Sequence, residues 1–195
     1  MARNTIEERD ENGVLLALKA LYEGREEEAE RLRPPDERLT LAEAAAFGRL
    51  ARMEDLLSQD AVLVNSYTPD GFTPLHLGVF GRHVDAVRLL LERGADVEAM
   101  SQNAFVRVRP LGTAAFVRET AIARLLLDQG ADPNGAGEGG FRPLHTAAQN
   151  GDADFTRLLL DHGADPSVAA DDGRTPADVA RDAGHASLVA TLRGS

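Results

Sequence analysis

The sequence repeats one nonapeptide three times. It reads RLLLERGAD at residues 88–96, RLLLDQGAD at 124–132 and RLLLDHGAD at 157–165, so the copies begin 36 and then 33 residues apart. A self-similar period of roughly 20 to 50 residues is typical of proteins that stack copies of one small structural unit. This period constrains the fold more than any local propensity does, and it predicts a repeat architecture.

A second motif follows the same period. TPLH at 73–76 is echoed by RPLG at 109–112, RPLH at 142–145 and TPAD at 175–178, in steps of 36, 33 and 33 residues. In the first three copies the motif begins 21 residues before the Gly of its own nonapeptide. Each unit therefore has a fixed internal length, and the chain varies in length only between units.

Each unit has the pattern of two short helices. Thr73 suits a helix N-cap because its hydroxyl can accept a hydrogen bond from a free amide, and Pro74 suits the first helical position. A first helix is predicted to end near Gly81, and Gly94 lies where a left-handed C-cap would end the second. The second helix is indicated by apolar residues at helical spacing, namely Val84, Val87, Leu90 and Leu91.

Two helices and an extended turn in about 33 residues, with TPLH at the first helix start, closely resemble the ankyrin repeat. DGFTPLHLGVFGRHVDAVRLLLERGADVEA, residues 70–99, carries nearly every position of that repeat, and residues 140–169 carry almost as many. Weaker copies are found at 12–32 and at 39–57, where Thr-Pro is missing, and a last copy begins at 172.

The chain thus resembles a small, single-domain ankyrin repeat protein of the bacterial type. The resemblance implies an all-α solenoid over residues 1–195, an ankyrin repeat array of about six helix-turn-helix units with β-hairpin fingers, capped at both ends. The approximate repeats are 5–36, 37–67, 68–102, 103–136, 137–169 and 170–195.

Composition narrows the classes of partner. The net charge of −11 argues against electrostatic binding to nucleic acid or to an anionic membrane. The absence of Cys excludes disulfides and thiolate chemistry. No apolar run approaches a membrane span, and the polar start MARNTIEERDENG does not read as a secretory signal. We expect a soluble cytoplasmic protein, monomeric by default, with neither nucleic acid nor membrane as a partner.

The residues that could suggest catalysis have structural explanations. His76 and His145 lie two repeats apart without Cys or carboxylate partners at ligand spacing, and the resemblance implies that they tie neighbouring turns together. GAGEGG at 135–140 matches a dinucleotide-binding pattern, but it follows a helix end instead of a strand and is predicted to be a flexible loop tip. We expect no enzymatic activity, no catalytic residue, no cofactor and no metal.

The aromatic residues indicate a surface for a partner. In ankyrin proteins the partner usually contacts the fingers and the ends of the inner helices, and six of the seven Phe fall in those columns. Phe155 alone occupies a core-like position. Packing against a neighbouring finger explains Phe72 and Phe141 equally well. The predicted partner-binding residues are Phe47, Phe72, Phe80, Phe105, Arg107, Arg109, Phe116, Arg118 and Phe141.

The stretch NAFVRVRPLGTAAF, residues 103–116, departs from the repeat. It lacks the Thr, the His and the Asp-Gly of its sister copies, and the loop from Gly94 to Pro110 is three residues longer. Alternating Val and Arg predict a longer extended arm that carries Phe105, with less rigidity because the His tie is gone. Both a distinctive contact site and tolerated drift fit this pattern.

These features predict a non-enzymatic scaffold for protein–protein interaction. Its partner would bind the concave inner-helix and finger surface of repeats two to five, anchored by aromatic side chains and set in register by Arg. Two other interpretations stay open: an inhibitor or immunity-type protein that blocks one enzyme, and a ligand-binding or enzymatic protein that uses the groove and its His residues.

Overall fold

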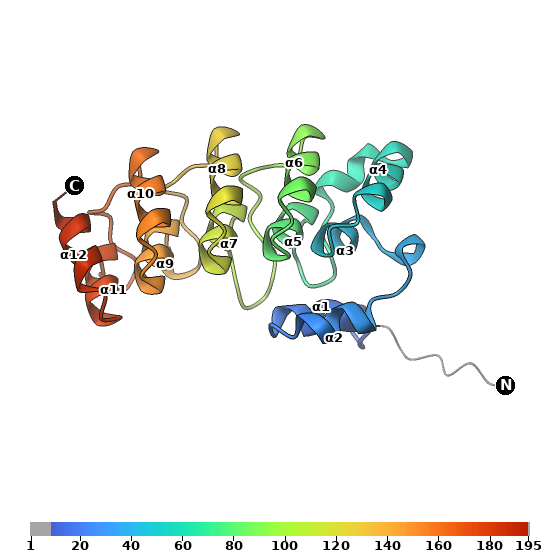
Figure 1. The fold of residues 1–195 in the computed structure, drawn as a ribbon, viewed down its shortest axis with the longest axis horizontal. Helices are drawn as coiled ribbons and strands as arrows, with labels where there is room; N and C mark the ends of the chain where they lie inside the picture. The colour runs from blue at the N-terminus through green and yellow to red at the C-terminus, as the bar shows by residue number, and fades with distance from the viewer. Residues whose placement is uncertain (1–8, 195) are drawn as a thin grey trace. The chain divides into compact units, whose positions relative to one another are not determined.

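A computed structural model describes residues 9–194, and the chain over this range is built from α-helices (Figure 1). It contains twelve α-helices and no β-strand there, with one isolated β-bridge between Arg9 and Leu15. The all-α class predicted from the sequence is confirmed. The contacts divide the chain into two compact units, unit 1 running to Ala95 with Gln102–Ala104, and unit 2 comprising Asp96–Ser101 and the chain from Phe105 onward. The single-domain organisation stays a prediction.

Unit 1 consists of three consecutive helix pairs. In its second and third pairs the inner helix α3 packs along α5, and the outer helix α4 packs on α6. Within each pair the two helices also contact each other. The helices are α1 (Leu16–Tyr22), α2 (Glu26–Leu32), α3 (Leu41–Ala46), α4 (Leu50–Gln59), α5 (Pro74–Phe80) and α6 (Val84–Glu92), with 3-10 turns η1 (Asp36–Arg38) and η2 (Ala61–Asn65).

Unit 2 repeats this arrangement. Its inner helices α7, α9 and α11 pack in succession, and the outer helix α8 packs on α10. The helices are α7 (Pro110–Val117), α8 (Thr120–Asp128), α9 (Pro143–Asn150), α10 (Ala153–Asp161), α11 (Pro176–Asp182) and α12 (Ala186–Arg193), with the 3-10 turn η3 (Glu138–Gly140). The count of about six repeats and the capping role of the end copies stay predictions.

Three inner helices, α3, α5 and α11, begin with reciprocal hydrogen bonds of a Thr N-cap. The Thr73 hydroxyl accepts from the His76 amide at 3.4 Å, and the His76 ring Nδ1 accepts from the Thr73 amide at 3.3 Å. At α11 an Asp takes the place of the His, so that the Thr175 amide donates to Asp178 Oδ2 at 3.1 Å. Each pair satisfies two amides that the helix itself leaves without acceptors.

The helix α3, whose start lacks Thr-Pro, uses the same device. Thr40 is its N-cap, and Glu43 Oε2 accepts from the Thr40 amide at 2.8 Å. The signal Thr-x-x-Glu was present in the sequence and fixes the start of this helix.

The core combines small side chains from the inner helices with branched side chains from the outer helices. Every residue of α3 from Leu41 to Ala46 is buried, and small side chains let neighbouring inner helices approach closely. Phe155 on α10 is fully buried, which confirms its predicted core position. The outer helices contribute further side chains with no exposed surface: Val87, Leu90, Ile122, Leu126 and Leu159.

The connections between pairs are turns. The Thr68 amide donates to Phe72 O and the Ala170 amide to Arg174 O, each at 2.9 Å, so each turn closes over four residues. No β-ladder forms at these turns anywhere in the described range 9–194, so the structure does not confirm the β-hairpin fingers.

A left-handed residue joins the two helices of each pair. The residue at this position is Gly24, Gly48, Gly151 or Gly184 in four pairs, whereas Arg82 and Arg118 adopt the same backbone with φ of 61° and 63°. Gly151 has a second constraint, because an added Cβ would lie 2.6 Å from the His185 ring. That ring is fixed by a 3.1 Å hydrogen bond between its Nε2 and Gln149 O.

Gly151→Ala and Gly184→Ala should separate these two constraints. Both residues have positive φ, which costs an L-residue about 1–2 kcal/mol, but a Cβ at Gly184 meets no atom within 4 Å. We expect Gly151→Ala to lower the free energy of unfolding by about 1 kcal/mol more than Gly184→Ala, because the His185 ring must move and lose its hydrogen bond. Urea unfolding of the full chain measures the difference, and equal losses would show that the ring imposes no constraint.

Candidate functional site

The long turn from Ser101 to Val108 is closed by the same kind of backbone hydrogen bond as its sister turns, but it is wider. The Ser101 amide donates to Val108 O at 2.9 Å, so this turn closes over seven residues where the turns at Thr68 and Ala170 close over four. The difference equals the three-residue lengthening found in the sequence. The extra length is therefore in the turn and not in the helices that follow.

A buried serine fixes the base of this turn. The side chain of Ser101, 2% exposed, donates to Val106 O at 2.7 Å and accepts from the Val108 amide at 3.0 Å. Thr68 takes the corresponding position in unit 1, where its hydroxyl accepts from the Phe72 amide and lies near Phe72 O, both at 3.0 Å. The altered repeat thus keeps the hydroxyl that closes its turn.

The change from His to Gly at position 112 also has a structural reason. A Cβ at Gly112 would lie 2.8 Å from Val108 Cγ2, so Val108 fills the space beside the helix start. A larger side chain at 112 would collide with it. The turn and the start of α7 are therefore matched to each other.

Two phenylalanines of unit 2 are exposed to solvent. Phe105 at the tip of the long turn is 89% exposed, its neighbour Val106 is 48% exposed, and Phe116 near the end of α7 is 66% exposed. The positions equivalent to Phe116 hold Gln149 on α9 and Asp182 on α11. A large apolar side chain therefore occupies a position where the sister helices present polar groups to water.

The three predicted arginines differ in their surroundings. Arg109 forms an ion pair with Glu98 at 3.3 Å between Nε and Oε2, and it donates to Ala136 O at 3.4 Å. Arg118 donates to Asn150 O at the end of α9. Arg107 is exposed on the turn. Arg109 and Arg118 thus join neighbouring repeats within unit 2, while Arg107 faces solvent beside Phe105.

The other predicted phenylalanines pack within their own unit. Phe47 is 8% exposed and belongs to the core. Phe141 is half-buried, with its ring centroid 5.2 Å from that of His145 and 5.7 Å from the Arg174 guanidinium carbon. Phe72 and Phe80 are half-buried and both contact Tyr22. Of the two explanations left open for Phe72 and Phe141, packing is the one that their contacts favour.

A cluster around Tyr22 in unit 1 was not predicted from the sequence. Its hydroxyl donates to Asp70 Oδ2 at 2.9 Å, and burial raises the pKa of the Tyr22 hydroxyl far above its usual range, with the Asp70 charge adding to the shift. Nearby on the same unit, Glu43 is 3% exposed and accepts from Arg9 at 2.5 and 3.0 Å. The residue types were visible in the sequence, but nothing in it indicated that the first helix pair reaches the third.

The histidines connect backbone groups. The buried His145 accepts at Nδ1 from the Arg142 amide at 3.3 Å, and its Nε2 donates to Arg174 O of the next turn at 3.1 Å. Burial lowers the pKa of His145, outweighing the bond to Arg174 O, and so favours the neutral ring that this pattern needs. Within residues 9–194 no group of three or more His, Asp or Glu side chains is arranged to hold a metal ion.

These features define a protein of stacked helix pairs whose turns are tied by Thr, His and Asp side chains. Residues 70–102 match the model of the ankyrin repeat, and residues 126–180 match the model of ankyrin repeats in many copies. The chain is an ankyrin repeat protein. Ankyrin repeats are generally protein-interaction modules, and the family is generally non-enzymatic.

Three curated relatives share part of the chain. Ankyrin repeat domain-containing protein 49 of Bos taurus is 43% identical over 58 residues, covering 30% of this chain and 24% of that protein. The Homo sapiens protein of the same name is 41% identical over 58 residues, covering 30% and 24%. Alpha-latrocrustotoxin-Lt1a of Latrodectus tredecimguttatus is 38% identical over 56 residues, covering 29% of this chain and 4% of the toxin. The matched part spans a quarter or less of each relative. Between residues 9 and 194, no helix has the length and apolar character needed to cross a bilayer.

The His145 tie predicts a pH dependence of stability. Because burial lowers the folded pKa below the unfolded value of 6.5, the unfolded chain binds more protons between the two pKa values. The stabilisation by His145 is therefore complete above pH 6.5 and is lost as the pH falls from 6.5 to the folded pKa. We expect the urea midpoint of the wild type to decrease as the pH is lowered from 7.5 to 5.5, and we expect a smaller decrease in His145→Gln. An equal fall of the urea midpoint in both proteins would contradict this role. The smaller fall that remains in His145→Gln is expected to come from His83, because burial lowers the pKa of His83 as well.

Proposed function

We propose that the protein binds a protein partner, without catalysing a reaction, through the exposed aromatic residues of unit 2, Phe105 and Phe116. The observation that carries the proposal is their exposure, 89% and 66%, in a protein whose other predicted partner-binding phenylalanines are packed. Membership of a family of protein-interaction modules supports the same function.

The energy available from covering these residues is large. Burying one Phe side chain stabilises a complex by about 1.5–3 kcal/mol relative to leaving it in water. Phe105 is carried by a turn whose base the buried Ser101 fixes, and Phe116 is carried by a helix. Because both backbones are held before binding, little conformational entropy is lost when a partner covers the rings.

The charge around Phe105 selects the partner. The whole chain has a net charge of −11, yet Arg107 stands exposed two residues from Phe105. A partner that places a carboxylate beside an apolar side chain would pair with Arg107 and cover Phe105 together. The preferred partner is therefore a protein with an apolar anchor flanked by acidic residues.

Phe105→Ala combined with Phe116→Ala should lower affinity for that partner by about 100-fold, the equivalent of about 3 kcal/mol. Both side chains are exposed, so the helical circular dichroism spectrum and the urea midpoint should be unchanged. The wild-type chain and the double variant would each be used to capture proteins from the native cell. A protein that the wild type captures and the double variant does not would then be purified and titrated against both forms.

Val62→Ala is the matched control, because Val62 is an exposed apolar residue of unit 1, 80% exposed. It should retain full binding. If the double variant binds the purified partner as tightly as the wild type does, the proposal is wrong. If the partner is an enzyme, loss of its turnover on binding would distinguish an inhibitor from a scaffold.

A further inference from the structure

The first helix pair is placed differently from the pairs that follow it. Within the described part of unit 1, α1 and α2 pack on each other, but neither packs along α3 or α4 in the way that α3 packs along α5. Figure 1 shows α1 and α2 oriented crosswise to α3 and α5, beside one end of these helices, instead of parallel to them. The turn at Gly13 lies near Pro69, since an added Cβ there would be 3.8 Å from Pro69 Cγ. The pair therefore covers a face of unit 1.

That face holds Tyr22 as a binding site would hold a ligand. The Tyr22 ring packs against Phe80 edge to face, with centroids 5.2 Å apart and an interplanar angle of 88°, and against Phe72 at 6.1 Å. Its hydroxyl donates to Asp70. A Tyr that buries its ring and bonds its hydroxyl has the features of an interface anchor.

The acceptors on this face are oriented by unit 1 itself. Asp70 accepts from the Thr68 hydroxyl at 2.6 Å through the oxygen that Tyr22 does not use. Glu43 accepts from the Thr40 amide at 2.8 Å while it pairs with Arg9. Both carboxylates would keep their positions if α1 moved away, so the face is preformed.

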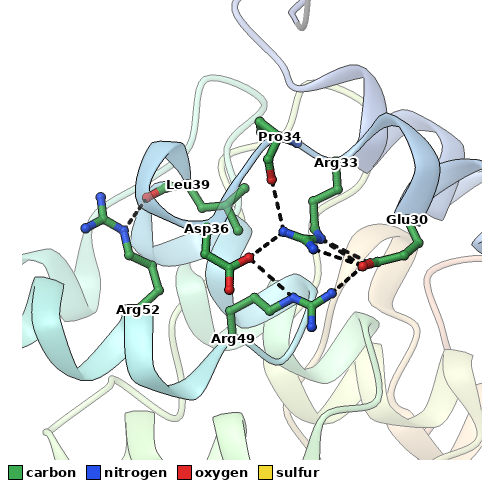
Figure 2. A network of polar contacts seen from close by, with 7 residues as sticks. All are labelled: Glu30, Arg33, Pro34, Asp36, Leu39, Arg49 and Arg52. Atoms are coloured by element: carbon green, nitrogen blue, oxygen red, sulfur yellow. Dashed lines mark hydrogen bonds and ion pairs between the residues drawn. The ribbon is translucent and has the colours of Figure 1, made fainter.

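Ion pairs with much solvent exposure attach the far end of the pair. Figure 2 shows that Arg49, at the start of α4, pairs with Glu30 of α2 and with Asp36. The distance from Arg49 Nε to Asp36 Oδ1 is 3.7 Å. Arg33 pairs with the same two carboxylates. Glu30 and Asp36 are 53% and 50% exposed. Such pairs contribute little stability and weaken as salt is added. In α2 itself only Ala29 is buried.

We propose that the face formed by Glu43, Asp70, Phe72 and Phe80 is a second docking surface, for a partner protein segment that presents an arginine and a tyrosine, and that the segment from Arg9 through α1 and α2 is a displaceable cover over it. The chain's own Arg9 and Tyr22 occupy the face in the way that such a partner would. The face presents two carboxylates and two aromatic rings, so a segment that carries one arginine and one aromatic hydroxyl fits it in both charge and shape. This proposal concerns unit 1 and does not depend on the role of Phe105 and Phe116.

Hydrogen exchange of the full chain tests the cover. Tyr22→Ala should speed amide exchange in α1 and α2 by at least about 10-fold, because a buried aromatic anchor is lost. In Tyr22→Ala, amide exchange in α4 and α6 should stay unchanged. In the wild type, adding 0.5 M salt should speed amide exchange in α1 and α2 by about 3-fold, because it weakens the exposed ion pairs. If α1, α2, α4 and α6 accelerate together, the pair is part of one cooperative core and the cover does not exist.

A peptide probe tests the docking surface. A synthetic peptide of residues 9–33 should bind the full-length Tyr22→Ala variant at least about 10-fold more tightly than the wild type, whose own cover competes. The same peptide with Tyr22→Ala, and the receptor variant Tyr22→Ala with Asp70→Ala, should each lose this binding. Equal affinity for wild type and variant, or no binding to the variant, would overturn the proposal. Binding through Phe105 and Phe116 should be unaffected by Tyr22→Ala, which separates the two surfaces.

Discussion

The hydrogen bonds at the starts of the inner helices are the constraint on which both units depend. A helix of six to eight residues leaves most of its terminal amides and carbonyls without internal partners, and it is marginal alone. A side chain three residues into each capped helix returns to the N-cap amide, as His76 does to Thr73 and Asp178 to Thr175. In the His145 copy the same ring also reaches Arg174 O of the next turn. Helix start and repeat spacing are thereby fixed by one side chain.

The altered repeat shows how this constraint can be met differently. With Gly112 in place of His, the tie is lost from the helix start, while Ser101 keeps the turn closed in the position that Thr68 has in unit 1. Val108 fills the space that Gly112 leaves. The turn can then be longer without disturbing α7, and its tip carries Phe105 into solvent. An exposed aromatic residue is added here by lengthening a turn whose base is held, because the base and not the tip sets the register.

The sequence predicted what depends on local chemistry and period. The helix pairs, the Thr and Pro starts, the left-handed Gly94 and the core role of Phe155 follow from spacing and from residue types that tolerate few alternatives. The exposure of each Phe did not follow, because column position gives the direction of a side chain but not what covers it. Phe47 is buried in the core, and Phe141 lies under Arg174, a residue of the following repeat. The reach of Tyr22 to the third helix pair is a tertiary contact that no local signal encodes.

Phe80 and Phe116 show how one column can have two roles. Each lies seven residues after the N-cap of its inner helix, and each lies at or near the end of that helix. Phe80 is half-buried because Tyr22 packs against it, whereas Phe116 is 66% exposed. The helix therefore does not decide whether the ring is available, since the backbone positions are equivalent. What decides it is whether the chain supplies a segment to cover the ring. The contact between Tyr22 and Phe80 is thus an internal example of the packing that an external partner would have to supply at Phe116: an apolar or aromatic edge with a polar group at its rim.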